Sequence, residues 1–351
     1  MIRYKCTVSY VGAAYCGWQT QKTGNSVQEQ IESALARIFD MPVRILAAGR
    51  TDAGVNARGQ VFQFDAEKEI RERKLMGALN GFLPGDIRIL RVEHKDALFH
   101  ARYCVKEKQY DYRINFGPYD VFSKDYAYQC PYHADIERMK EAARYFVGTH
   151  DFTSFNSNPL RETPDQVRTI DSITFEEEGS ILKISYRGRG FLRYMVRMMT
   201  AALLEAGRGR MEPEEISRLL EAKSKTVCRR NAHPEGLTLE KIEYFEVIAM
   251  TASLTVREVL PEDAASDLLR GTWVLADRHT DRLYGEYLEA AGGGILILTE
   301  SGAAEIQAEL EAIIAQLKEY QKKRSIPERM IVLNQEEAQS RKADECGRDS
   351  A

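Results

Sequence analysis

The chain reads AAGRTDAGVNA over residues 47–57, and the rest of the sequence is best understood outward from this stretch. Two glycines enclose its polar run, which suits a tight loop because glycine tolerates backbone angles that other residues avoid. Apolar residues precede it over 43–48, and apolar and polar residues alternate after it over 60–65. The pattern predicts a strand, a tight loop and a second strand, with the carboxylate of Asp52 at the apex of the loop.

An aspartate in such a loop often does no more than hydrogen-bond its own backbone. Here, however, the string GRTDAGV at residues 49–55, followed by GQV at 59–61, closely resembles the catalytic loop of the tRNA pseudouridine synthase A family. The chain departs from the family pattern at Asn56, where a histidine is usual. The resemblance implies that Asp52 is the catalytic nucleophile or base.

The resemblance covers about residues 1–246 and singles out two more site residues. In the family, the first tyrosine of the string at residues 108–112 lies against the target base, which implies that Tyr110 either stacks on the base or helps to remove the C5 proton. The arginine of the family's Phe-x-x-x-Met-Val-Arg motif pairs with the catalytic aspartate, which carries Arg197 into the site. Residues 229–234 differ from the family's Ala-Pro-Ala run, and we expect them to alter one rim of the cleft and shift substrate choice. The matching strings are GWQ (17–19), SVQE (26–29), FHAR (99–102), KQYDY (108–112), HDFTSF (150–155), FLRYMVR (191–197) and EGLTL (235–239).

The order of elements in the first part predicts a split βαβ unit. Ser26 and Glu29 fit a capping box that opens an amphipathic helix. Strands are predicted at residues 4–10, 43–48, 61–64 and 87–92, and a second helix at 70–79. With the resemblance, this predicts an α+β fold of two ferredoxin-like halves (split βαβ) joined into one antiparallel sheet with a central RNA-binding cleft.

Residues 1–103 are predicted to form a catalytic half that carries the Asp52 loop, and residues 104–246 a second half. Tyr110 and Tyr112 share one face of a predicted strand, and Arg193 and Arg197 share one face of a predicted helix. Beyond the resemblance, apolar stretches predict a small α/β appendage over 247–334, followed by a disordered polar tail over 335–351. The appendage stretches are strands at 247–254, 272–275, 295–299 and 330–333 and a helical stripe from Ala303 to Leu317.

The net charge of −4 is unevenly distributed along the chain. Residues 1–245 contain 37 Lys and Arg against 33 Asp and Glu, whereas residues 246–351 contain 12 against 20, which together make the totals of 49 and 53. The first part is therefore mildly basic and the last part acidic. Binding to a polyanion such as RNA is expected in the first part.

Several classes of site and of location are not indicated. The six cysteines are scattered without a Cys-x-x-Cys pair, so we expect reduced thiols and no metal centre. The sequence has no cofactor motif. Apolar runs are shorter than the roughly 20 residues that span a bilayer, and the first residues lack a signal-peptide pattern. We therefore expect a cytoplasmic protein without a membrane partner.

The isomerisation implied by the resemblance suits these residues. It breaks the C1′–N1 bond of uridine and joins C5 to C1′, which requires neither a metal nor a redox group. Asp52 must be ionised to act on the ribose, and a fixed cation such as Arg197 counters the cost of burying its charge. Because the target base must leave its stack, Arg50 is a candidate to fill the vacated space. Candidates for phosphate contacts are Arg187, Arg189, Arg193, Arg208 and Arg210.

The predicted function is pseudouridylation of tRNA in the anticodon stem-loop, by a protein that the family implies is a homodimer. A related synthase acting on another RNA, such as ribosomal RNA, is one alternative. A catalytically inactive RNA-binding protein is the other, although intact Asp52, Tyr110 and Arg197 argue against it. There are three hypotheses for the role of the appendage: it docks an unknown partner, it caps the cleft, or its charge repels RNA that is not the target.

Overall fold

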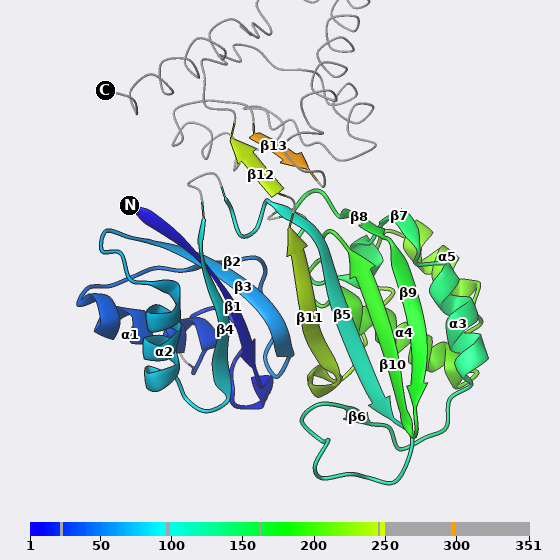
Figure 1. The fold of residues 1–351 in the computed structure, drawn as a ribbon. Helices are drawn as coiled ribbons and strands as arrows, with labels where there is room; N and C mark the ends of the chain where they lie inside the picture. Colours follow the sequence, from blue (N-terminus) through cyan, green and yellow to red (C-terminus); the bar gives the residue numbers. More distant parts are fainter. Residues whose placement is uncertain (22–23, 96–98, 162, 245, 250–295, 300–351) are drawn as a thin grey trace, which may run out of the picture. The chain divides into compact units, whose positions relative to one another are not determined.

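The computed structural model describes residues 1–21, 24–95, 99–161, 163–244, 246–249 and 296–299 (Figure 1). The chain divides into two compact units. The first contains Met1–Lys95 and His100–Tyr244, and the second contains Asp96–Phe99 and Phe245–Ala351. The candidate site residues all belong to the first unit.

Along the chain, the elements of the first unit up to β4 are called the first half and those from β5 onward the second half. The first half contains β1 (Ile2–Tyr10), η1 (Gly12–Ala14), α1 (Val27–Phe39), β2 (Leu46–Ala47), β3 (Asn56–Ala66), α2 (Glu72–Phe82) and β4 (Ile87–Lys95). The second half contains β5 (Val105–Asn115), β6 (Tyr128–Gln129), α3 (Ile136–Arg144), β7 (Gly148–Asp151), η2 (Thr153–Phe155), β8 (Val167–Ile170), β9 (Ser172–Glu178), β10 (Ile181–Gly188), α4 (Met195–Gly207), α5 (Glu215–Glu221), η3 (Pro234–Gly236) and β11 (Leu237–Tyr244).

A nine-stranded sheet runs through both halves in the order β4-β1-β3-β11-β5-β10-β9, with β2 paired to β3 and β6 paired to β5. Neighbouring strands are antiparallel except for β3 with β11 and β5 with β6. The halves join where β11 pairs with β3, with Thr238 opposite Asn56 and Leu239 opposite Ala57 (Figure 1). The predicted α+β fold with one large, mostly antiparallel sheet is therefore confirmed.

Helix α1 forms as its sequence predicts. The Ser26 hydroxyl accepts a hydrogen bond from the Glu29 amide at 3.2 Å, which satisfies one of the free donors at the start of the helix. Val27, Ile31 and Leu35 are spaced along one face of the helix and are all buried. Capping and apolar spacing therefore act together to set this element.

Helix α4 is buried on nearly all sides and packs against α3. It begins at Met195, because Tyr194 before it adopts the left-handed region with φ of 63°. Arg193 therefore lies outside the helix, and the expectation that Arg193 and Arg197 share one helix face is wrong. The chain turns sharply at Tyr194, so spacing along a regular helix does not apply across that residue.

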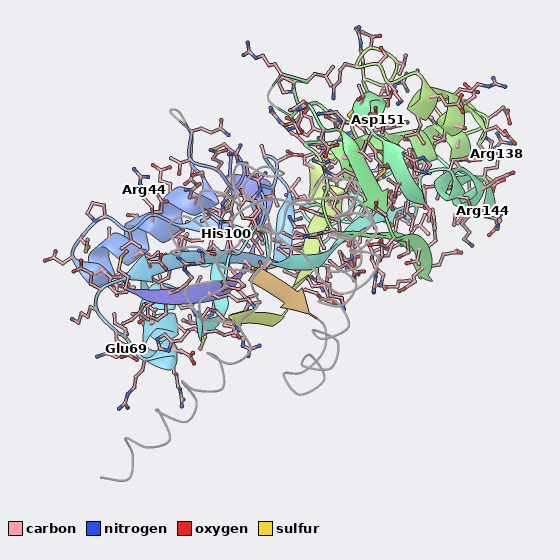
Figure 2. All side chains as sticks on the ribbon, turned by 90° about the horizontal axis from the view of Figure 1, so that it is seen from above. Arg44, Glu69, His100, Arg138, Arg144 and Asp151 are labelled. Atoms are coloured by element: carbon pink, nitrogen blue, oxygen red, sulfur yellow. The ribbon has the colours of Figure 1, made fainter. Side chains whose placement is uncertain are left out.

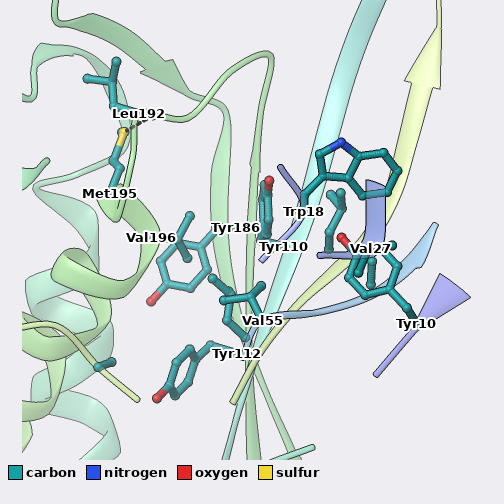
Figure 3. Close-up of a cluster of buried hydrophobic side chains, with 14 of the residues drawn as sticks. Tyr10, Trp18, Val27, Val55, Tyr110, Tyr112, Tyr186, Leu192, Met195 and Val196 are labelled. Carbon is teal, nitrogen blue, oxygen red and sulfur yellow. Dashed lines mark hydrogen bonds between the residues drawn. The ribbon is translucent and has the colours of Figure 1, made fainter. Parts of the chain in front are cut away.

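Aromatic side chains from both halves contribute to the buried core (Figure 3). Trp18 is 2% exposed, and its ring lies 5.9 Å from that of Tyr10. Tyr112 and Tyr186, from the neighbouring strands β5 and β10, are fully buried in the same cluster. Trp18 is therefore a core residue. Tyr10 at the end of β1 and Tyr110 in the middle of β5 belong to the same cluster.

The second unit contains the antiparallel pair β12 (Glu246–Ala249) and β13 (Leu296–Thr299). Two of the strands predicted in the appendage, over 247–254 and 295–299, overlap these elements. The other predictions for this region, including the strands at 272–275 and 330–333 and the tail at 335–351, fall outside the described residues. Within the described part of the chain, every helix is too short or too polar to cross a membrane.

Candidate active site

The Asp52 loop connects β2 and β3 and is fastened on both sides of the carboxylate. The Trp18 amide donates to the Thr51 carbonyl at 3.1 Å, and the hydroxyls of Tyr10 and Thr51 are 2.8 Å apart. The Val55 amide donates to the Asp52 carbonyl at 3.1 Å. These bonds fix the backbone and leave the Asp52 side chain 18% exposed.

Glycine is required at Gly17, which lies in the loop between η1 and α1, at the point where that loop contacts the Asp52 loop. Its φ is +109°, and a Cβ there would lie 2.8 Å from the Thr51 carbonyl oxygen. A side chain would therefore strain the local backbone and also push the Asp52 loop away. The string GWQ thus supplies close backbone contact through its glycine and core packing through its tryptophan.

Arg197 reaches Asp52 from helix α4 of the second half. Its Nη1 lies 3.4 Å from Asp52 Oδ2, while its Nε donates to the Ala232 carbonyl at 2.8 Å. The Ala232 amide in turn donates to the Arg197 carbonyl at 3.0 Å. The Arg197 side chain is only 13% exposed, so the cation is held in place on two sides. The structure therefore brings together the two residues that the resemblance pairs.

Burial raises the pKa of the Asp52 carboxyl above its ordinary value, while the neighbouring charge of Arg197, and to a smaller extent that of Arg193, opposes this rise. The Arg197 contact at 3.4 Å is longer than the 2.7–2.9 Å typical of a strong charge-assisted hydrogen bond. The desolvation cost therefore outweighs the attraction in this arrangement. Any loosening of Arg197 would leave Asp52 still more easily protonated.

Tyr110 lies on β5 and is 8% exposed. Its ring meets that of Phe191 edge-on, with the centroids 5.2 Å apart. Burial raises the pKa of the Tyr110 phenol, and Tyr10 and Asp52 add to the rise. The phenol is therefore protonated at neutral pH, and Asp52 is close enough to influence it. Figure 3 shows Tyr110 among the core side chains with its hydroxyl at the end of the ring.

Lys108 is a site-proximal residue that sequence reasoning missed. From β5 its ammonium donates to the Ala48 carbonyl at 2.8 Å, and Gln60 donates to the Gly49 carbonyl at 3.0 Å. Both bonds hold the start of the Asp52 loop. Burial, together with the charge of Arg102, lowers the pKa of Lys108 to about 8. The sequence did contain a signal for Lys108: it lies two residues before Tyr110 on the same strand, so the two side chains share one face of that strand.

The predicted phosphate-binding arginines have different surroundings. Arg193 is exposed and stacks against the Tyr194 ring at 4.9 Å, whereas Arg187 pairs with Glu107 at 3.6 Å. Arg208 pairs with Glu205 at 3.3 Å and lies 3.7 Å from the centroid of the Tyr132 ring. Arg50, Arg189 and Arg210 are exposed. Of this set, Arg193 alone contributes directly to the electrostatics of Asp52.

Charged side chains are distributed over both halves of the unit. Figure 2 shows Arg44 and Glu69 on the first half and Arg138, Arg144 and Asp151 on the second.

Within the described residues, no group of three or more His, Cys, Asp or Glu side chains is arranged to hold a metal ion. Cys6, Cys16, Cys130 and Cys228 there have free thiols.

The Asn56 side chain links the two halves through hydrogen bonds. It is 3% exposed, and its side-chain oxygen accepts from the Gly12 amide at 2.8 Å. Its side-chain nitrogen donates to the Asp125 carbonyl at 2.8 Å and to the Glu235 carbonyl at 3.1 Å. The departure from the family's histidine is therefore accompanied by three structural hydrogen bonds, one accepted and two donated.

Replacing Asn56 with alanine should lower the free energy of unfolding by about 2–4 kcal/mol, because the buried Gly12 amide and the partly buried carbonyls of Asp125 and Glu235 lose their partner. Urea denaturation followed by circular dichroism measures this change. Asn56→His serves as the comparison, since an imidazole has one donor and one acceptor nitrogen and should retain part of the stability. A loss below about 0.5 kcal/mol for the alanine variant would mean that water replaces these bonds.

Known proteins are similar to this chain over most of the first unit. Residues 7–104 and 142–245 match the family described as tRNA pseudouridine synthase. The chain belongs to this family. It is 44% identical over 248 residues to tRNA pseudouridine synthase A of Oceanobacillus iheyensis, which covers 70% of this chain and 98% of the relative. It is 42% identical over 247 residues to the enzyme of the same name from Exiguobacterium sp., covering 70% of this chain and all of the relative. The synthase A of Bacillus pumilus is 42% identical over 246 residues, covering 69% of this chain and 99% of that protein.

Proposed function

We propose that this chain isomerises uridine to pseudouridine in tRNA, within the anticodon stem-loop. Membership of the tRNA pseudouridine synthase family supports the reaction class. The observation that carries the proposal is the partly buried Asp52 carboxylate, presented on a fastened loop with Arg197 at 3.4 Å. A carboxylate in this setting suits attack on, or proton removal from, the ribose of a nucleotide that enters from outside.

In this mechanism the C1′–N1 bond of the target uridine breaks and a bond from C1′ to C5 replaces it. The proton on C5 leaves, and N1 ends as a protonated nitrogen, so that atoms and charge balance without an external reagent. Asp52 acts on the sugar in its ionised form. Arg197 and Arg193 favour that form, because both cations oppose the rise in its pKa that burial causes.

Tyr110 is assigned a role at the base. Its pKa is raised by burial, by Tyr10 and by Asp52, so the phenol carries its proton at neutral pH. A neutral phenol stacks against a uracil ring and donates a hydrogen bond, but it is a weak base. We therefore assign Tyr110 to holding the base rather than to removing the C5 proton.

Arg50 is assigned to the space that the flipped base leaves. It lies two residues from Asp52 on the same loop and is exposed, so it is available to a large substrate. Arg187, Arg189 and Arg193 are assigned to phosphates of the stem, where contacts position RNA without reading its sequence. Ferredoxin-like halves with an RNA cleft between them, and a homodimer, complete the proposal; sedimentation equilibrium of the full chain would test the dimer.

Arg50→Lys is expected to lower turnover on the order of tenfold, because lysine keeps the charge but lacks the planar guanidinium that replaces a stacked base. Single-turnover kinetics on tRNA measure the change. Arg44→Lys is the matched control, since Arg44 is an exposed arginine of the first half with its side chain 83% exposed (Figure 2). Equal rates for wild type and Arg50→Lys would remove Arg50 from the mechanism.

The proposed function is tested by tritium release from tRNA labelled at C5 of uridine. The expected result is release of one equivalent per modified site, with the product pseudouridine located in the anticodon stem-loop by chemical mapping. Release from labelled ribosomal RNA and none from tRNA would assign a different RNA. Binding of tRNA without release from either substrate would indicate an inactive RNA-binding protein.

A further inference from the structure

Residues 232–235, which are the two residues before η3 and the first two residues of η3, are held by side chains from three different elements. The Ala232 carbonyl accepts from Arg197 Nε on α4 at 2.8 Å. The His233 carbonyl accepts from the Tyr112 hydroxyl on β5 at 2.8 Å, and the Glu235 carbonyl accepts from Asn56 on β3 at 3.1 Å. Three of the four backbone carbonyls in this short segment therefore have side-chain donors that come from both halves of the sheet.

The same segment also contacts the loop that carries Asp52. A Cβ built on Gly54, two residues after Asp52, would lie 3.0 Å from the ring of Pro234, so the proline packs closely against this glycine. The His233 ring stacks on that of Tyr128, with the centroids 4.6 Å apart and the planes 14° apart. Residues 232–235 therefore contact the loop that carries Asp52, through Pro234, and also bind the Nε of Arg197, through the Ala232 carbonyl.

We infer that residues 232–235 form a positioning clamp that holds the Arg197 guanidinium against Asp52, and that Tyr112 anchors the clamp. Tyr112 is fully buried, and its hydroxyl bond to His233 lies between the two points at which the segment contacts Arg197 and the Asp52 loop. Its ring packs against Gly236, where a Cβ would come within 2.7 Å of Cζ. The inference rests on the proposed function, because it concerns the same carboxylate.

The clamp has a specific electrostatic consequence. Arg197 and Arg193 are the cations that oppose the rise in the pKa of Asp52, and Tyr110 on β5 is a titratable group that interacts with it electrostatically. Without the Tyr112 hydroxyl, the His233 carbonyl loses its donor and the segment that orients Arg197 Nε is less constrained. Arg197 then spends less time at Asp52, so Asp52 takes up a proton at higher pH.

The test compares Tyr112→Phe with wild type in the full chain. Turnover near neutral pH should fall about 10- to 100-fold, as expected when a reacting group is misplaced by a fraction of an ångström to one ångström. The fall should appear in kcat more than in KM for tRNA, and the acidic limb of the pH profile of kcat should move to higher pH. The carboxyl ¹³C signal of Asp52, assigned by its absence in Asp52→Asn, should titrate at higher pH in the variant.

Tyr4→Phe is the matched control. The Tyr4 hydroxyl is also buried in part against a backbone carbonyl, that of Ile70 at 3.1 Å, but it lies in the first half on β1. Both variants should lower the melting temperature, whereas Tyr4→Phe should leave the pH profile and the Asp52 titration unchanged. If Tyr112→Phe fails to fold, Pro234→Ala removes the ring that contacts Gly54 and should move the Asp52 titration in the same direction by less.

The outcomes separate the inference from the proposed function. A lower melting temperature for Tyr112→Phe with an unchanged pH profile and Asp52 titration would make Tyr112 purely structural and overturn the inference. If the Asp52 signal of Tyr112→Phe titrates at higher pH than that of the wild type, the clamp is upheld. If the wild-type protein at the same time releases no tritium, the proposed reaction is contradicted.

Discussion

Asp52→Asn is expected to lower tritium release from tRNA by more than about 10⁴-fold, because asparagine has nearly the same shape but cannot act as a nucleophile or base. Affinity for tRNA, measured by filter binding, should change little. Asp40→Asn is the matched control: Asp40 is exposed and ends α1 in the left-handed region with φ of 56°, where asparagine is well tolerated. Residual release near wild-type levels in Asp52→Asn would assign catalysis to another residue.

The raised pKa of Asp52 also predicts how Asp52→Asn changes the stability of the folded protein. Because the pKa of Asp52 is raised in the folded state, the folded protein binds this proton more tightly than the unfolded chain does. Its favourable contribution is present at low pH and is lost as pH rises through the folded pKa. Asp52→Asn mimics the protonated form, so at neutral pH it should melt at a temperature equal to or above that of wild type. Calorimetry would show a clear decrease instead if the Arg197 pair were net stabilising.

Arg197→Met is expected to lower turnover by about 10²- to 10³-fold, the range found when one preorganised charge contact is removed from a site. The acidic limb of the pH–rate profile should also move to higher pH, because burial then raises the pKa of Asp52 with only Arg193 opposing it. Arg197→Lys should be intermediate, since lysine keeps the charge but has no Nε to donate to Ala232. The measurement is kcat as a function of pH.

Arg144→Met is the control for this change, because Arg144 is an exposed arginine in the last turn of α3 (Figure 2). It should leave both the rate and the pH profile unchanged. An Arg197→Met enzyme that is slower but has the wild-type acidic limb would mean that Arg197 acts on the substrate and not through the charge state of Asp52.

Some elements could be predicted because local interactions decide them. The Ser26 cap and the apolar spacing after it are enough to begin and orient α1. Others could not. The segment at 60–65 alternates, yet Val61 and Phe62 on opposite faces of β3 are both buried. Val61 is covered by Ala48 and by Val105 of β5, which belongs to the other half. Burial of that face depends on a strand more than forty residues away in the sequence.

The sequence by itself determined the identity of the Asp52 loop, since its glycines and polar run act within a few residues and resemble one family. Only the tertiary structure decided what surrounds it. Asp52 and Arg197 are 145 positions apart, Tyr112 and His233 are 121 apart, and Asn56 and Glu235 are 179 apart. Such contacts depend on the register of β11 against β3 and β5, which no local pattern specifies. The charge state of Asp52 is therefore a property of the assembled sheet.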